Sequence, residues 1–389
     1  MDRVRNFLNK NQWIAVFLFA LPFLNESFPT SYFVYVWIKE DILKLFSFLI
    51  LLFLFIRRKK KFSFLFGILI VLEGMLVVSS LINYRSFGSY EYEKMFFDVI
   101  CILMMALIVE YFIDIPDQLI KGLLLNFEIA VYSYFIDIVF HLSGEGYYRR
   151  GLLATLLLWI LPGICTALLN ICINRKYIRS FCFIVISIYV VYYVMNATTV
   201  VALAAMFGAM IFGIVLYRFN RKLPFSVLLI AAVLLNLFVL FVYSGDNFPF
   251  VSFIIEKILK KSTTFTDRDV IWKEAMRMIR EKPIFGHGSR PVLDVANQWA
   301  DQYPHSHNQL LQKLNESGIF GLAIFSAFHL QLIRKADGSE NNIVRIILIS
   351  AVFGISMTYI TEAYKKFFVF YLVFFLLYRC EDLLKDRYL

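Results

Sequence analysis

Charged side chains are scarce in this sequence. Asp, Glu, Lys and Arg make up only 17% of its 389 residues, whereas a soluble domain carries about 25%. Instead, 60% of the residues are hydrophobic, 42 are Phe, and the mean hydropathy is +0.69. This balance excludes an ordinary soluble domain and is typical of membrane helices.

Cysteine is also rare, and its placement excludes two kinds of site. None of the five cysteines lies in residues 244–316, the one long polar segment. A disulfide framework is therefore excluded there, although an extracytoplasmic compartment would permit one. Since no Cys-x-x-Cys or Cys–His spacing occurs, we predict neither haem nor a structural metal, and no cofactor.

Apolar runs near the length of a membrane crossing fill the rest of the chain. They predict an all-α, polytopic membrane protein with about twelve transmembrane helices. We expect the first span to be retained, because no small-residue cleavage site follows it. The predicted parts are helices one to nine (1–243), an outer helical cap (244–316), and the last three helices with a tail (317–389). The predicted span cores are 13–29, 35–56, 62–82, 96–112, 122–141, 151–173, 181–196, 198–217, 223–243, 317–333, 343–361 and 366–378.

Lys and Arg are distributed unequally between alternate short loops, most visibly at Arg57–Lys61. By the positive-inside rule the richer set faces the cytoplasm, together with both termini. Residues 244–316 then lie on the far side of the membrane, which is the periplasm, or the cell exterior in a single-membrane organism. The net charge of +10 suits anionic lipids or diphosphates. Because it is spread over short loops, we do not predict nucleic acid as a partner.

The outer segment predicts an amphipathic helix after Thr266-Asp267-Arg268-Asp269, which has the hydroxyl and acids of a helix start. Lys282-Pro283 should end this helix, and Gly286-His287-Gly288 predicts a flexible turn. The basic face is either solvated beside the membrane or attractive to phosphate groups. The apolar face consists of Ile271, Trp272, Ala275, Met276 and Ile279, and the basic face of Lys273, Arg277 and Arg280.

A second outer helix is predicted at the histidine cluster. Ser306 and Gln309 have the spacing of a capping box, which puts His307 at the first helical position. The helix dipole disfavours imidazolium there, so His307 is a candidate general base beside an anion-binding helix end. The expected buried stripe is Leu310, Leu311 and Leu314, and Gly318 should stop or bend the helix, with Gly321, Ala323 and Ser326 small enough for close packing.

Other interpretations of these groups stay open. His307 could be an ordinary interfacial histidine, or His305 and His307 could bind zinc with His287 and Asp294 or Asp301. Acids within spans are typical of ion pathways, which makes a secondary transporter the alternative to an enzyme. No inverted repeat supports a transporter. These acids are Glu73, Glu128 and Asp137.

His307-Asn308, followed after nine residues by Gly318-Ile319-Phe320-Gly321, resembles the H-[N/S/Q]-x9-G-x-x-G signature of bacterial O-antigen ligases. Their superfamily also includes O-antigen polymerases. Arg268-Asp269-Val270-Ile271-Trp272 and Lys282–Gly288 are similar to the Arg…Trp…P-x-x-G-x-G approach in the same outer loop. The resemblance implies a GT-C-like fold in the inner membrane.

The resemblance also implies a metal-independent, inverting transfer of a glycan from undecaprenyl diphosphate to a sugar hydroxyl of lipid A–core. A polymerase would instead join undecaprenyl-diphosphate-linked repeat units. The family's second arginine is missing at Met195–Thr199, where Arg149 and Arg150 could replace it or only anchor the interface. By the resemblance, His307 is the general base, Arg268 stabilises the diphosphate, and Arg290, His305, Asn308, Arg149 and Arg150 are candidates for substrate binding.

Overall fold

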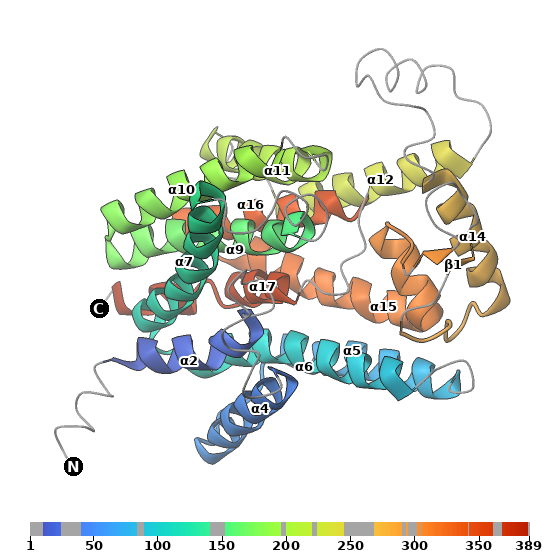
Figure 1. Cartoon of the computed structure of the whole chain (residues 1–389), viewed down its shortest axis with the longest axis horizontal. Helices are drawn as coiled ribbons and strands as arrows, with labels where there is room; N and C mark the ends of the chain where they lie inside the picture. The colour runs from blue at the N-terminus through green and yellow to red at the C-terminus, as the bar shows by residue number, and fades with distance from the viewer. Residues whose placement is uncertain are drawn as a thin grey trace.

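A computed structural model shows a helical protein (Figure 1). It describes residues 11–24, 40–83, 89–140, 152–195, 200–219, 224–244, 268–289, 293–294, 302–303, 305–340, 342–360 and 368–387. The helices are α2 (Gln12–Leu24), α4 (Glu40–Arg57), α5 (Phe64–Ile82), α6 (Ser89–Phe112), α7 (Pro116–Phe140), α9 (Leu152–Asn174), α10 (Tyr177–Met195), α11 (Val200–Phe219), α12 (Phe225–Ser244), α14 (Arg268–Glu281), α15 (Gln309–Gly338), α16 (Ile343–Thr358) and α17 (Val369–Tyr378). A 3₁₀ helix, η5 (Asp382–Arg387), follows, and the short strands β1 (Leu293–Asp294) and β2 (Gln302–Tyr303) pair antiparallel.

Each predicted span core overlaps one apolar helix, so the predicted helical fold with many apolar helices is confirmed. Within the described residues, 4 helices are long and apolar enough to cross a membrane, judged by length and composition. The number of crossings and the side of the outer segment remain predictions, as do the three part boundaries. The four helices are Phe64–Ile82, Tyr92–Phe112, Pro116–Phe140 and Gln309–Gly338.

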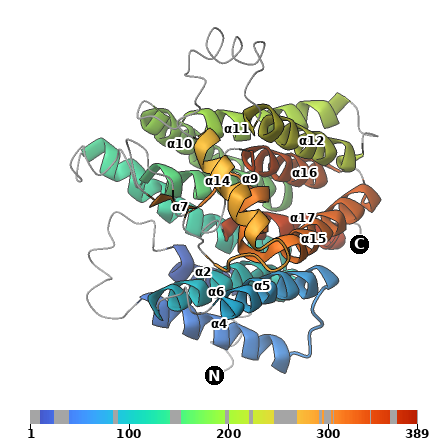
Figure 2. The same cartoon turned by 90° about the vertical axis from the view of Figure 1, so that its right-hand side faces the viewer.

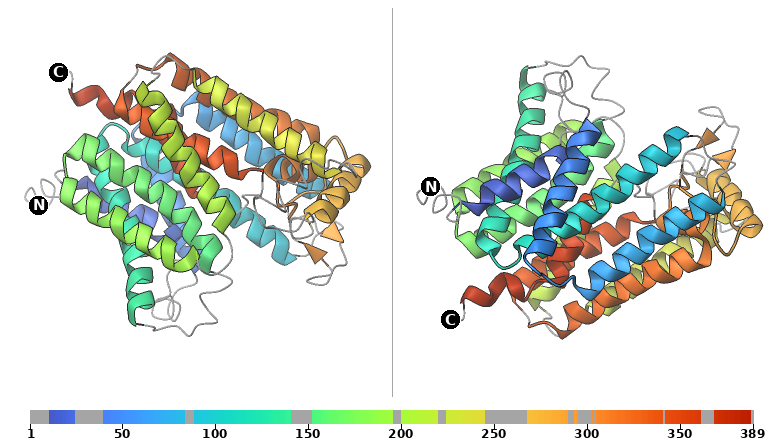
Figure 3. Two further views of the ribbon diagram at one scale, coloured as in Figure 1. Left: turned by 90° about the horizontal axis from the view of Figure 1, so that it is seen from above. Right: turned by 90° about the horizontal axis from the view of Figure 1, so that it is seen from below.

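Small residues let neighbouring helices approach closely in the core. A Cβ on Gly122 of α7 would lie 2.6 Å from Trp13 O in α2. A Cβ on Gly213 of α11 would lie 2.8 Å from Ser350 Oγ in α16. Such contacts drive helix association where lipid removes the hydrophobic advantage of burial. Figure 3 shows α15, α5 and α12 running along the same long direction toward α14.

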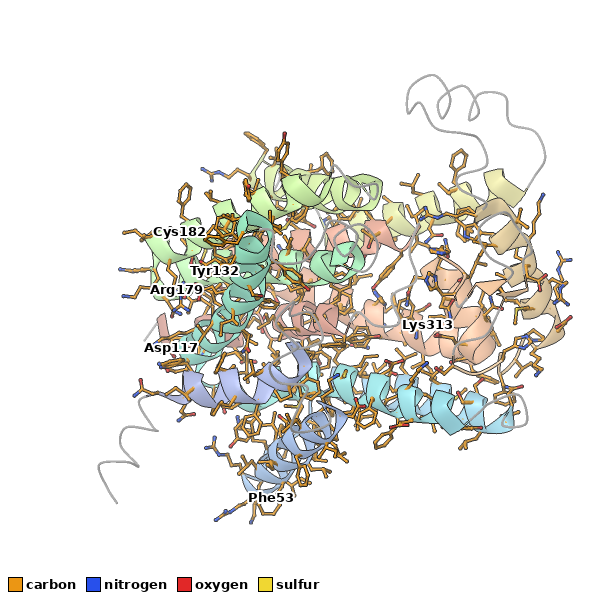
Figure 4. All side chains as sticks on the ribbon, in the orientation of Figure 1. Phe53, Asp117, Tyr132, Arg179, Cys182 and Lys313 are labelled. Atoms are coloured by element: carbon orange, nitrogen blue, oxygen red, sulfur yellow. The ribbon has the colours of Figure 1, made fainter. Side chains whose placement is uncertain are left out.

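The basic turns gather at one end of the molecule. Their contacts join segments that are distant in sequence, and Arg179 and Asp117 also lie at this end in Figure 4, with Lys313 nearer α14. The opposite end holds α14, the end of α5 and the beginning of α15 (Figures 1 and 2). The contacts at the basic end are Lys60–Asp114 (2.6 Å), Asn174–Asp117 (3.1 Å), Arg379–Glu110 (3.9 Å) and Lys335–Glu381.

An ion pair satisfies one of the acids predicted within spans. Glu128 of α7 is only 5% exposed. Arg179 of α10 donates to both of its carboxylate oxygens, with Nε at 2.6 Å from Oε1. A bidentate pair of this kind fixes two helices to each other. Glu128 therefore has a structural partner, while the side chain of Asp137 lies outside the described part.

Removing Arg179 should destabilise the α7–α10 contact. In Arg179→Ala the buried Glu128 carboxylate keeps its desolvation cost without its donors, which costs about 1–3 kcal/mol. We expect a lower thermal unfolding midpoint in detergent and recovery in Glu128→Gln/Arg179→Met. The control, Arg218→Ala, changes an exposed arginine of α11 and should leave the midpoint unchanged. Equal midpoints for Arg179→Ala and wild type would contradict this role.

Candidate active site

The last turn of α5 holds the turn formed by Lys282–Ser289. Side chains from α5 satisfy backbone groups that no regular structure pairs. The bonds link Ser79 Oγ to the carbonyls of Phe285 and Glu316 (2.7 Å for the latter), Asn83 Nδ2 to Gly286 O (3.0 Å), and Ser289 N to Ser80 Oγ (2.8 Å). Residues more than 200 positions apart therefore meet at this end of the molecule.

A break at Gly318 divides α15 into a short outer part and a long inner part. Gly318 has φ 62° and ψ −159°, so the carbonyls of the preceding turn lose their helical donors. The Lys282–Ser289 turn supplies replacements. His287 N donates to Asn315 O (2.7 Å), Gly288 N donates to Glu316 O (2.9 Å), and Ile319 N donates to Pro283 O (2.9 Å). The predicted bend at Gly318 is confirmed.

Both glycines at this junction are required by space as well as by φ. A Cβ on Gly318 would overlap Ile284 O and lie 2.7 Å from Phe285 N. Gly286, with φ 69°, would bring a Cβ to 2.6 Å from Asn315 O. The predicted turn at Gly286-His287-Gly288 is present, with positive φ at both glycines. Its backbone conformation requires glycine, and the amides of His287 and Gly288 are hydrogen-bonded to carbonyls of α15 just before the break.

Asn308 caps the beginning of α15 and fastens it to α12 and to the segment just after α16. Its Oδ1 accepts from Leu310 N (3.0 Å) and Leu311 N (3.2 Å), which caps the helix. Its Nδ2 donates to Asn236 Oδ1 (2.9 Å) and to Ile360 O (3.2 Å). The side chain is fully buried. Asn308 therefore acts as the anchor of the signature instead of presenting a free amide to substrate.

The predicted capping box at Ser306 was wrong. Asn308 is the N-cap, so His307 precedes the helix instead of occupying its first position. His307 adopts φ 47°, the left-handed conformation. Local spacing favoured Ser306 with Gln309, but the bonds of Asn308 to distant helices decide where the helix begins. The dipole argument for His307 loses its geometric basis, because its own amide is not part of the helix.

His305 and His307 form one half-buried pair of rings. Their centroids are 4.0 Å apart and their planes meet at 65°. His287 is separate from this pair, since its Nε2 lies 2.8 Å from Met278 O. The structure therefore brings together two of the three clustered histidines.

Several predicted positions lie outside the described residues. These include the substrate-binding candidates Arg149, Arg150 and Arg290. The stretch that lacks the family's second arginine is described only at Met195. Among the described side chains, no three His, Cys, Asp or Glu residues form a group that could hold a metal ion. The Asp294 side chain and Asp301, named in the zinc hypothesis, are not among them.

The outer part of α15 buries a polar face, contrary to the predicted leucine stripe. Leu311 is buried, but Leu310 and Leu314 are only partly so. The residues that pack inward recur at helical spacing and are almost all polar. They are Gln309, Gln312, Lys313, Asn315, Glu316 and Ser317.

Charges within this polar face balance only in part. Lys313 Nζ lies 3.2 Å from Glu316 Oε2, and both residues are nearly inaccessible. Glu73 of α5, 2% exposed, also interacts electrostatically with both. Lys313 therefore has one carboxylate, that of Glu316, in direct contact and a second acid, Glu73, nearby. Glu73, predicted as a possible pathway residue, belongs to this cluster at the α5–α15 contact.

The predicted amphipathic helix is present as α14. Ile271, Trp272 and Ala275 are buried, and they pack with Leu293 of β1 and Leu311 of α15. Pro283 follows the helix end, as predicted. This packing positions the start of α14 relative to the start of α15.

Arg268 is the first residue of α14 and is half-buried. On the basic face, Arg277 is already engaged by Glu274 (2.6 Å) and Glu281. Its guanidinium holds the pKa of the Glu274 carboxyl below the usual range. The helix thus offers fewer uncompensated cations than its sequence implied.

Sequence reasoning missed the polar groups that support the signature. These are Ser79, Asn83, Asn236, Gln312, Lys313 and Glu316. The one available signal was the helical spacing of polar residues at 309, 312, 313 and 316 in a chain so short of charge. In a membrane protein, a polar helix face packs either against other buried polar groups or against a water-filled cavity.

A comparison with protein families finds a match to the O-antigen ligase model over residues 182–326. The matched region contains α14, the Lys282–Ser289 turn, the histidine pair and the break in α15. No curated protein matches the chain. The match supports membership of the O-antigen ligase family, and with the apolar helices it indicates a multi-pass membrane protein.

Gly318→Ala should disrupt this junction. The substitution forces an alanine into the left-handed region, at about 1–2 kcal/mol, and adds a clash with the backbone of Ile284. We expect a lower thermal unfolding midpoint and easier proteolysis of the 282–289 turn. Gly74→Ala is the control, since a Cβ there meets nothing within 4 Å. An unaltered Gly318→Ala midpoint would refute the role of the break.

Proposed function

From the match of residues 182–326 to the O-antigen ligase model, we propose that this protein is an inner-membrane glycosyltransferase with its site on the periplasmic side. It moves a glycan from undecaprenyl diphosphate to a sugar hydroxyl of lipid A–core, with inversion and without a metal ion. The observation that carries the proposal is the fixed turn at His307. Hydrogen bonds of Ser306 and Asn308 hold this turn in place. Most other polar clusters among the described residues are ion pairs that join helices.

His307 is the proposed general base. It removes the proton from the acceptor hydroxyl as that oxygen attacks the anomeric carbon of the donor. Arg268, at the start of the adjacent α14, is the proposed cation that stabilises charge growing on the leaving diphosphate. The anomeric carbon–oxygen bond to the diphosphate breaks as the new glycosidic bond forms. His305, in contact with the His307 ring, and Arg290 are proposed to bind substrate.

A cavity beside the signature supports a substrate with a hydrocarbon chain. It measures about 450 Å³ and lies between α12, α15 and α16. Its lining is mainly Leu, Ile, Val and Phe side chains, with Asn236, Ser326, His329, Ser356 and Tyr359 as polar groups. Asn236 and Tyr359 also bond to the beginning of α15. An apolar space continuous with the anchors of His307 suits a lipid-linked donor.

The placement of charge supports the proposed orientation. The turns rich in Lys and Arg gather at one end of the molecule, and η5 lies there too. The candidate site lies at the other end (Figure 1). Under the positive-inside rule, this arrangement favours cytoplasmic termini and a periplasmic site.

Two substitutions test the proposed chemistry. We expect His307→Ala to lower kcat by about 10²–10⁴, the usual contribution of a general base. Arg268→Ala should lower it by about 10²–10³ through loss of charge stabilisation. The measurement is transfer from undecaprenyl-diphosphate-linked glycan to lipid A–core in liposomes, with a chelator present. Arg218→Ala, at the far end, is the matched control for arginine loss.

Folded His307→Ala protein that keeps a kcat within about threefold of wild type would exclude general-base catalysis by this residue. Loss of wild-type transfer in chelator would instead support the zinc hypothesis.

A deletion distinguishes ligase from polymerase, which share the donor chemistry. For the ligase, lipopolysaccharide gels should show core without attached glycan, while lipid-linked polymer accumulates. Core carrying a single repeat unit would identify the polymerase instead. Unchanged lipopolysaccharide, together with proton-coupled solute uptake by the purified protein in liposomes, would favour the transporter.

A further inference from the structure

His307 is held in a backbone conformation that it would not adopt alone. Left-handed φ costs a residue with a Cβ about 1–2 kcal/mol. The conformation persists only where neighbouring contacts determine it. Those contacts come from the residues on either side. Asn308 is anchored by α12 and Ile360, and Ser306 is buried and bonded to Gln312.

Gln312 is the support of Ser306. Its Oε1 accepts from Ser306 N at 2.9 Å and lies 3.1 Å from Ser306 Oγ. The Ser306 hydroxyl also lies 2.9 Å from Asn308 O. The two neighbours of His307 are thus joined to each other, and both are fixed through the first turn of α15. Gln312 itself is 1% exposed, so water does not compete for these bonds.

The orientation of the Gln312 amide is set by Glu316. Gln312 Nε2 donates to Glu316 Oε1 at 2.9 Å. An ionised carboxylate can only accept hydrogen bonds, so it selects the NH₂ side of the amide and turns Oε1 toward Ser306. Lys313 Nζ donates to the other Glu316 oxygen, Oε2, at 3.2 Å, the contact expected of a carboxylate. The hydrogen bonds thus run in a chain from Ser306 to Gln312, from Gln312 to Glu316, and from Glu316 to Lys313.

We propose that Gln312 is a positioning residue that, oriented by Glu316, fixes the His305–Asn308 turn so that the His307 imidazole is aligned with the acceptor. This inference rests on the proposed role of His307. It assigns a second function to the buried polar face of α15, beyond its packing against α5.

Removing the support should affect alignment more than binding. In Gln312→Met the side chain keeps its size but loses both hydrogen bonds. We expect kcat to fall by about 10- to 100-fold, since a displacement near 1 Å has this effect on reacting groups. KM for the donor should change little. Gln331→Met, the same change near the inner end of α15, is the control and should retain wild-type kcat.

Hydrogen exchange gives a readout that needs no glycan. The Ser306 amide is protected by Gln312 Oε1, so a peptide covering 305–308 should exchange faster in Gln312→Met. Peptides from α7 and α9 should exchange as in wild type. Faster exchange in Gln312→Met, together with no transfer activity in the wild type, would show that Gln312 fixes the turn but would reject the proposed function. Wild-type activity with unaltered exchange and kcat in Gln312→Met would reject the positioning role.

Gln312→Glu supplies a test by pH. A protonated glutamic acid has one acceptor and one donor, as glutamine has, whereas its ionised form cannot donate to Glu316. The ratio of Gln312→Glu to wild-type activity should therefore rise toward one as pH falls, or stand near one throughout. Because both proteins contain His307, dividing one activity by the other removes the pH dependence that His307 itself contributes. A ratio that stays low at every pH would overturn the proposal. The titratable groups around this position are Lys313, Glu316, Glu73 of α5, Asp98 of α6, Tyr371 of α17, His305 and His307.

Discussion

The break in α15 at Gly318 is the constraint on which the outer end of the molecule depends. Opening one turn of a helix leaves carbonyls without donors, which is costly away from water. Here the Lys282–Ser289 turn supplies the missing amides and receives a bond from Ile319 in return. The exchange joins α14, α15 and the end of α5 into one unit. Neither the turn nor the break is satisfied without the other.

The absence of water from the buried interior also explains why the polar side chains of α15 are hydrogen-bonded to one another and to neighbouring segments. Gln312, Lys313 and Glu316 satisfy one another, and Asn308 finds partners on α12 and beyond α16. Buried polar groups that are connected in this way give the signature a single geometry. For a reaction that needs a base and a leaving group held apart at fixed positions, that single geometry is the useful property.

The sequence was sufficient to predict those features that depend on residues close together in the chain. Hydropathy located the helices, and the period of Ile271, Trp272 and Ala275 identified the buried face of α14. It was insufficient where distant residues decided the outcome. Ser306 and Gln309 satisfied a local capping rule, yet Asn308 caps the helix because Asn236 and Ile360 hold it there. The polar face of α15 was equally hidden, since its partners come from α5 and the loops. Both errors come from contacts between residues far apart in the chain.

The bonds from Ser79, Ser80 and Asn83 to the Lys282–Ser289 turn have a consequence for how the protein is assembled. The region that matches the family model begins at residue 182, far beyond α5. It therefore contains the signature from His307 to Gly321 but lacks the α5 groups that complete the backbone bonding of the adjoining turn. During synthesis α5 is made long before the Lys282–Ser289 turn. The contacts between them can therefore form only after most of the chain has been inserted. The matched segment is thus not a module that could be moved alone to another scaffold.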